Sequence, residues 1–182
     1  VTGRYEMHAL LHQYAREALE AAGELELIYR KHAEYYVGFL CEREKKLISR
    51  SQSRALDEIQ KELGNLREAY LWIAAKRDLA ALQAAIPVFY GFCDMRSLLY
   101  EGEAVFRHAA EALKPSSGEH GHPAWALALL SWYDMRTYQQ RLDSLVEISA
   151  LAQACHDEML SGGHSEGLAA ACVLLGAIAE DQ

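Results

Sequence analysis

Apolar residues recur at steps of three and four along almost the whole chain, and this spacing constrains the fold more than any other feature. Clear examples are the stretches 10–22, 25–47 and 56–73. Such spacing places apolar side chains on one face of an α-helix. Residue usage agrees: Ala and Leu supply 29 and 26 residues, whereas Val, Ile and Thr, which favour strands, together supply 15. The sequence therefore predicts an all-α fold.

Polar breaks divide the first half of the chain into expected helices. The opening helix, with an apolar stripe facing a core, stops at Gly23. One long helix is predicted over 24–48, and the polar loop 49–53 separates it from a second helix over 56–73. We expect these two helices to pair antiparallel, so that 24–78 forms a unit of its own.

The second half predicts shorter helices in pairs. Asp78 is suited to cap a helix over 79–95, which Pro87 should kink or restart. Further helices are predicted over 97–113, 124–140, 143–160 and from 165 onward. Matching positions recur at a spacing in the low forties, which indicates stacked helix pairs. We therefore expect 79–182 to form tetratricopeptide-like repeats in a right-handed αα-superhelix, cut off at the C-terminal end.

Charge and cysteine usage limit the environment and the partners. The net charge of −8 disfavours nucleic acid as a partner, because phosphate binding needs clustered Lys and Arg. No apolar run approaches the roughly 20 residues that span a membrane. The four cysteines are far apart, with no C-x-x-C spacing, which predicts buried free thiols in a reducing compartment. We expect a cytoplasmic protein and, from the opening Val1-Thr2-Gly3, an excised fragment.

Several stretches, in their order along the chain, carry motifs of one known family. The stretch 4–11, RYEMHALL, resembles the winged-helix segment that carries a Met-His-Asp motif in STAND-class signalling NTPases of the bacterial transcriptional-regulator type. The stretch 62–72, ELGNLREAYLW, is similar to an E-x-x-N-L-R-x-A-x-x-W signature. The stretches 100–102 and 165–169 resemble turns and first helices of the sensor arrays. By this resemblance, 1–23 is the tail of a winged-helix domain, and the rest belongs to the sensor.

The resemblance implies a nucleotide contact at His8, which corresponds to the histidine that contacts bound ADP in the family. The family aspartate is replaced here by Ala9, which puts that contact in doubt. The chain has no G-x-x-x-x-G-K-[ST] loop, so ATP, ADP and Mg²⁺ are expected only in a longer protein and this part is expected not to be an enzyme. The alternative for His8 is local hydrogen bonding at a corner before a helix.

Other histidines do not predict a metal site. His8 and His12 have helical ligand spacing but no evident third ligand, and a solvated surface is the better interpretation. His120 and His122 lie in the loop 114–123, where a flexible connector is the simpler explanation. His156-Asp157-Glu158 lacks the H-E-x-x-H order. No side chain has the neighbours of an activated nucleophile.

The candidate binding residues come from the expected repeats, where the first helix of each pair lines a groove. The alignment places four residues there: Asp94, Tyr133, Arg136 and Glu180. Trp125, Trp132 and Tyr138 lie nearby, and core packing is the competing interpretation for the tryptophans. The expected function is a sensor arm that binds a protein or small-molecule inducer and regulates an oligomerising ATPase. The alternative is a scaffold or adaptor of the same fold without nucleotide control.

Overall fold

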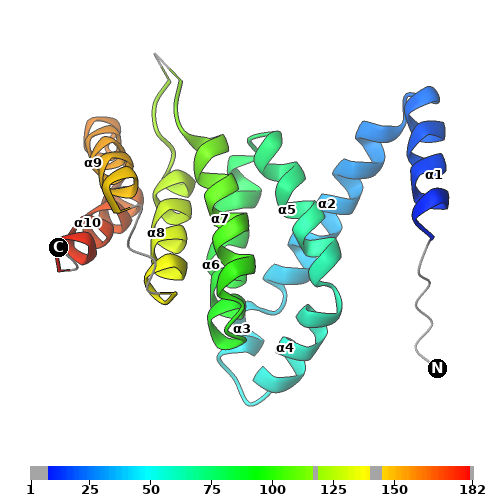
Figure 1. Cartoon of the computed structure of the whole chain (residues 1–182), viewed down its shortest axis with the longest axis horizontal. Coiled ribbons are helices and arrows are strands. Elements are labelled where there is room, and N and C mark those ends of the chain that lie inside the picture. The colour runs from blue at the N-terminus through cyan, green and yellow to red at the C-terminus, as the bar shows by residue number, and fades with distance from the viewer. Residues whose placement is uncertain (1–7, 117–118, 140–144, 181–182) are drawn as a thin grey trace.

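The computed structural model describes residues 8–116, 119–139 and 145–180 and confirms the all-α prediction, with no strand in these ranges. The helices form an elongated row, with α1 at one end and α9 and α10 at the other (Figure 1). Their bounds are α1 (Ala9–Ala21), α2 (Leu25–Cys41), α3 (Glu44–Leu47), α4 (Gln52–Lys61), α5 (Leu63–Ala75), α6 (Leu79–Met95), α7 (Leu99–Leu113), α8 (Pro123–Thr137), α9 (Leu145–Gly162) and α10 (Ser165–Glu180).

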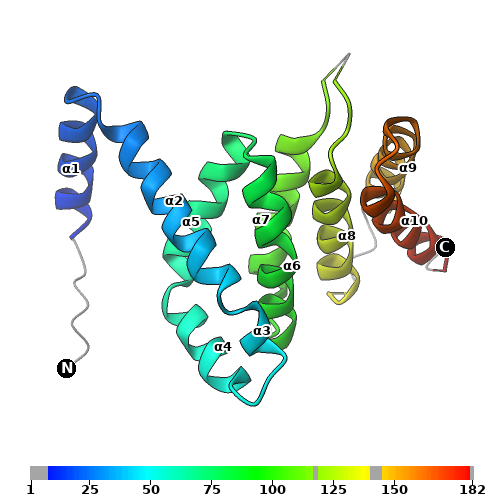
Figure 2. The ribbon, with the colours of Figure 1, turned by 180° about the vertical axis from the view of Figure 1, so that it is seen from behind.

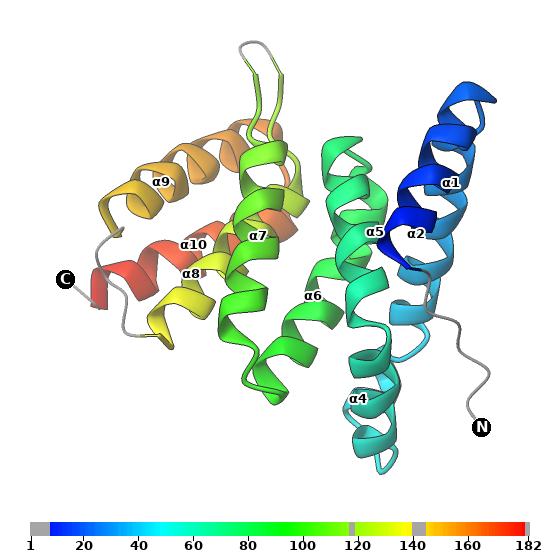
Figure 3. The ribbon, with the colours of Figure 1, turned by 45° about the vertical axis from the view of Figure 1, so that its right-hand side comes forward.

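The larger helices stack in pairs that form two layers. Helices α2, α6, α8 and α10 contact one another in that order, and α5 contacts α7 in the other layer. The contacts that join the layers include α2 with α5, α6 with α7, α7 with α8, and α9 with both α8 and α10. Seen from behind, α2 lies across α5 (Figure 2). At the C-terminal end of the row, α9 and α10 follow α8 (Figure 3). This is the arrangement expected of a helical-repeat superhelix.

The core lies between the layers and is centred on aromatic side chains. Tyr70 of α5 packs against Phe89 of α6 and Phe106 of α7, with ring centroids 5.5 and 6.2 Å apart. Phe92 stacks on Phe89 at 6.0 Å. Aromatic pairs at these distances attract one another beyond the gain from burying their area. One cluster therefore ties three helices together at the centre of the row.

The predicted helix over 24–48 is broken in two. It ends at Cys41, and after a turn at 42–43 the chain forms the short helix α3. Arg43 stabilises the turn: its guanidinium donates to the Phe39 carbonyl oxygen at 2.7 Å and pairs with Glu58 of α4 at 2.9 Å. The break also lets Leu47 become buried. Tertiary contacts thus outweigh the continuous helical spacing of the sequence.

The predicted helix over 56–73 is also interrupted, at Glu62. This residue has a non-helical backbone between α4 and α5. Its carboxylate accepts hydrogen bonds from Asn65 at 2.8 Å and from the Tyr36 hydroxyl at 3.3 Å. Helix α5 packs against α2 and runs antiparallel to it, whereas α4 packs against α3.

The helix-end predictions hold at two positions. Asp78 caps α6 by accepting from the Ala81 N–H at 3.1 Å, and Gly23 follows α1 with a left-handed φ of +70°. Helix α6 continues through Pro87, which lies on its exposed side.

The apolar stripe of α1 does not face a core, contrary to the prediction. Helix α1 packs against α2, but Leu10, Leu11 and Tyr14 remain exposed, Tyr14 at 71%. The helical spacing was sufficient to predict the helix, but the neighbour that its stripe would need is absent among the described residues.

Candidate functional site

Helices α6 and α8 present one outward surface that joins carboxylates and tyrosines. The hydroxyl of Tyr90 on α6 donates to Oδ2 of Asp134 on α8 at 3.0 Å. Asp94 lies on α6 one turn after Tyr90 and acts electrostatically on Asp134, and Tyr138, just after α8, acts on Tyr90. We call Tyr90, Asp94, Asp134 and Tyr138 the acid–tyrosine surface. Tyr90 and Asp134 are half-buried, whereas Asp94 and Tyr138 are exposed.

Helical phase explains why these residues gather on one surface. The outward stripe of α8 follows steps of three and four through Leu127, Leu130, Asp134 and Tyr138, all at least partly exposed. On α6 the outward stripe consists of small or rigid residues that end at Asp94: Ala80, Ala84, Pro87 and Gly91. A partly apolar strip therefore leads to an acidic end.

The acid–tyrosine surface carries two carboxylates whose negative charge is not offset by a cation in the described residues. Burial raises the pKa of Asp134 above its ordinary value, the hydrogen bond from Tyr90 opposes this rise, and the charge of Asp94 adds to it. Burial, and then Asp134, raise the pKa of Tyr90, so it stays a protonated donor. Within the described residues, neither Asp94 nor Asp134 is in an ion pair with Lys, Arg or His.

The four residues predicted to line a groove divide into two kinds. Asp94 and Glu180 are exposed. Tyr133 and Arg136 are buried, at 3% and 7% exposure, which differs from the expectation that they face an open groove. The Arg136 guanidinium instead pairs with Glu103 of α7 at 3.0 Å, and Gln139 donates to the same carboxylate at 3.0 Å.

The aromatic residues near this region divide in the same way. Trp125 and Trp132 are buried in the core, so the packing interpretation holds for both. Tyr138 is 56% exposed. Tyr90 and Asp134 were not predicted from the sequence, although Asp134 is adjacent to Tyr133.

His8 makes a local contact. Its Nδ1 accepts a hydrogen bond from the Leu10 N–H at 3.3 Å and caps α1, which is the alternative role that the sequence suggested. The side chains of Ala9 and His12 lie outside the described residues. The nucleotide role of His8 in a longer protein stays a prediction.

The described residues contain few features that would support metal binding or a reactive cysteine thiol. No group of three or more His, Cys, Asp or Glu side chains there is arranged to hold a metal ion. The loop at 119–122 is docked, because the Gly121 N–H donates to Glu158 of α9 at 3.2 Å. Burial raises the pKa of the Cys155 thiol to about 12 and that of Cys93 further still, as expected of buried thiols; Cys172 is exposed.

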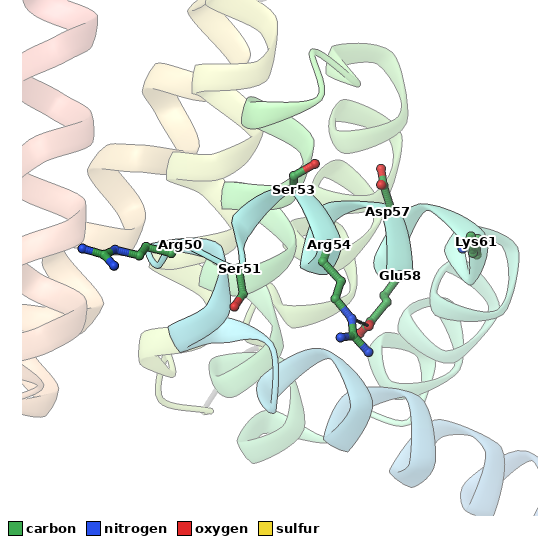
Figure 4. Close-up of a pocket in the computed structure, with 7 residues that line it drawn as sticks. All are labelled: Arg50, Ser51, Ser53, Arg54, Asp57, Glu58 and Lys61. Atoms are coloured by element: carbon green, nitrogen blue, oxygen red, sulfur yellow. Dashed lines mark hydrogen bonds and ion pairs between the residues drawn. The ribbon is translucent and has the colours of Figure 1, made fainter.

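A shallow concavity of about 550 Å³ runs along α4 (Figure 4). Its lining charges are largely matched: Arg54 pairs with Glu58 at 2.9 Å, and Asp57 pairs with Arg96, which directly follows α6. Arg50 points away from the Arg54–Glu58 pair, and Asp57 lies on the other side of α4 (Figure 4). Because these side chains do not converge, the concavity is a weaker candidate than the acid–tyrosine surface.

No family model, curated protein or solved structure matches this chain. No described helix is both long and apolar enough to cross a membrane.

Proposed function

We propose that the chain is a non-catalytic sensor and protein-interaction arm of a STAND-class signalling ATPase. A protein or small-molecule inducer binds to the helical-repeat array, on the layer formed by α2, α6, α8 and α10. The observation that carries this proposal is the acid–tyrosine surface, where two carboxylates lie near tyrosine side chains and have no cationic partner within the described residues. Nucleotide and Mg²⁺ belong to an ATPase module in a longer protein.

In this proposal, binding regulates the ATPase through a shift between two forms. An inducer can shift the equilibrium only by its difference in affinity for the two forms. Stacked helix pairs suit this task, because each pair contacts mainly its neighbours and a small change in packing is passed along the row. The inducer therefore favours the open, oligomerising form of the ATPase over the closed, ADP-bound form.

Deletion of residues 79–182 from the full-length protein tests this function. ATP hydrolysis and oligomeric state are measured for the full-length and deleted proteins, each with and without a cell extract that activates the former. We expect the deletion to abolish the response or to change the basal level. Identical activation of both proteins would reject the proposed sensor role.

The second candidate is a scaffold or adaptor without nucleotide control. The local hydrogen bond from the Leu10 N–H to His8 favours it, because it gives this histidine a structural task. The residues encoded upstream of Val1 distinguish the two candidates: a phosphate-binding loop belongs to the ATPase and is not needed by a scaffold.

Location and partners follow from the same chemistry. The net charge of −8 makes nucleic acid a poor partner for this part. The buried free thiols of Cys93 and Cys155 fit a reducing compartment, so we place the protein in the cytoplasm.

A further inference from the structure

Among the described residues, the carboxylate of Asp134 lacks the cationic partner that two other carboxylates at helix contacts, Glu58 and Glu103, have. Glu103 at the α7–α8 contact pairs with Arg136, and Glu58 at the α3–α4 contact pairs with both Arg43 and Arg54. Asp134 is also half-buried, yet its partner in the described residues is the neutral hydroxyl of Tyr90. A partly desolvated carboxylate beside a second one is unfavourable unless a cation compensates for it.

The neighbours of Asp134 suit an organic cation better than a metal ion. The Tyr90 hydroxyl contacts Asp134, and Tyr138 lies close to Tyr90. Aromatic faces attract ammonium and guanidinium groups. The carboxylates of Asp94 and Asp134 can both accept hydrogen bonds from an ammonium or guanidinium group. A metal ion would need more ligands, and the described residues contain no cluster of three that could supply them.

The rest of the surface indicates that the cation belongs to a peptide. From Leu127 to Tyr138 the outward stripe of α8 extends about 16 Å, which is longer than a single side chain. Leu127 and Leu130 offer partly exposed apolar area at the end opposite the acids. On the neighbouring helix, the exposed stripe of α6 carries the small or rigid residues Ala84, Pro87 and Gly91.

We propose that the acid–tyrosine surface binds a peptide segment of a partner protein through one Lys or Arg side chain. The cation lies between Asp94 and Asp134 and against the rings of Tyr90 and Tyr138, and an apolar side chain of the same segment contacts Leu127 and Leu130. This inference rests on the proposed binding function and specifies its occupant.

The test begins with a random nonamer library displayed on phage and selected on the immobilised 182-residue chain. We expect the enriched peptides to share one Lys or Arg next to apolar residues. A synthetic consensus peptide is then titrated by fluorescence anisotropy against the wild type and Asp94→Asn/Asp134→Asn. The double variant should weaken binding by about tenfold or more, because it removes both charges.

Two controls separate this effect from folding and from general charge. The variant Glu147→Gln/Asp157→Asn removes two exposed carboxylates from α9 and should bind within about twofold of wild type. A peptide with norleucine in place of its Lys or Arg should lose as much affinity for the wild type as the charged peptide loses for the double variant. This second arm does not require a variant to fold.

The outcomes distinguish the inference from the function on which it rests. Peptides that bind without a basic preference, or equally well to Asp94→Asn/Asp134→Asn, overturn the inference and leave a binding module intact. Spermidine binding at this surface as tightly as the peptide overturns the peptide occupant. Failure to enrich any peptide overturns the inference, whereas the sensor function is judged by deletion of 79–182.

Discussion

At the residue scale, the first prediction concerns the buried hydroxyl of Tyr70 and its effect on stability. Its ring packs in the aromatic core, but its hydroxyl has no hydrogen-bond partner in the described residues. Tyr70→Phe keeps the ring contacts and removes an unsatisfied polar group, so we expect stability to be unchanged or to rise by about 1 kcal/mol. Urea denaturation measures the change. Tyr90→Phe is the control, because it removes a hydrogen bond to Asp134 and should lower stability.

If Tyr70→Phe instead lowered stability by more than about 1 kcal/mol, the hydroxyl would have a stabilising partner, such as a buried water molecule.

The second residue-scale prediction concerns the pH dependence of Asp134→Asn. The folded protein holds the proton of this carboxyl more tightly than the unfolded chain does, because burial raises its pKa. The ionised carboxylate therefore weakens folding above its folded-state pKa, and this cost disappears as the pH falls below the ordinary value of 3.8. Asp134→Asn should be more stable than wild type at pH 7, with a difference that shrinks on acidification.

Denaturant midpoints between pH 3 and pH 7 check this prediction against Asp157→Asn on α9. Hydrogen bonds, first from His156 and then from Gln153, lower the pKa of Asp157, so its contribution has the opposite sign. That variant should lose stability at pH 7. A stabilisation of Asp134→Asn that did not vary with pH would mean that ionisation of Asp134 is not the cause.

The sequence predicted part of this candidate site, and the reason for the error is specific. Asp94 and Tyr138 were identified, but Tyr133 and Arg136 were assigned to the surface instead of Asp134. Helix α8 is apolar on most of its circumference because α7, α9, α10 and α6 all contact it. With so little polar surface, its sequence leaves the outward direction undefined. The partly exposed Leu127 and Leu130 mark the outward face of α8, but this face can be recognised only when the helices packed around α8 are known.

At the element scale, two glycines of α10 predict opposite effects of the same substitution. A Cβ at Gly167 would overlap Sδ of Met159 and lie 3.1 Å from Cα of Pro123, whose backbone cannot easily move. Gly167→Ala should therefore destabilise the protein by about 1–3 kcal/mol through overpacking against α8 and α9. Gly176→Ala meets nothing within 4 Å and should stabilise by about 0.5–1 kcal/mol, because alanine favours helix.

Thermal and urea denaturation of the two variants measure both effects. Two equal shifts of the same sign would show that α10 does not pack against α8 and α9 as described.

The next prediction at this scale concerns how the ion pair between α7 and α8 affects stability. Arg136 and Glu103 form a buried ion pair, which Gln139 supports by donating to Glu103. Glu103→Ala leaves a guanidinium buried without this carboxylate and should cost about 3–5 kcal/mol. The double variant Glu103→Leu/Arg136→Met replaces the pair with apolar groups and should cost much less. A double variant as unstable as the sum of Glu103→Leu and Arg136→Met made singly would show that the pair is not coupled.

Helix identity was predictable at this scale, but helix continuity was not. Every predicted helical segment is helical in the described residues, because the spacing of apolar residues reports local structure directly. The breaks at 42–43 and at Glu62 depend on partners far along the chain, such as Glu58 for Arg43 and Tyr36 for Glu62. The spacing of apolar residues along the chain cannot predict contacts with residues that are distant in sequence.

At the scale of the whole molecule, the row of helices predicts an uneven distribution of stability. In a stacked array each helix pair is stabilised mainly by its neighbours, so an end element contributes only what it buries. Helix α1 leaves Leu10, Leu11 and Tyr14 exposed beside α2, whereas α10 buries Ala171, Leu174 and Ile178 against α8 and α9. The pattern in the sequence was equally helical at both ends, so this difference could not be predicted from it.

Deletion of each end tests this asymmetry. Removal of 1–23 should change the free energy of unfolding by less than about 1 kcal/mol, because the described apolar side chains of α1, Leu10, Leu11 and Tyr14, are exposed. Removal of 165–182 should cost more than about 3 kcal/mol, since each fully buried Leu or Ile contributes roughly 1.5–3 kcal/mol. Hydrogen exchange on the intact chain supplies an independent measurement: amides of α1 should exchange fastest and those of α6 slowest. Equal losses from the two deletions, or slow exchange in α1, would show that the N-terminal helix is an integral part of the array.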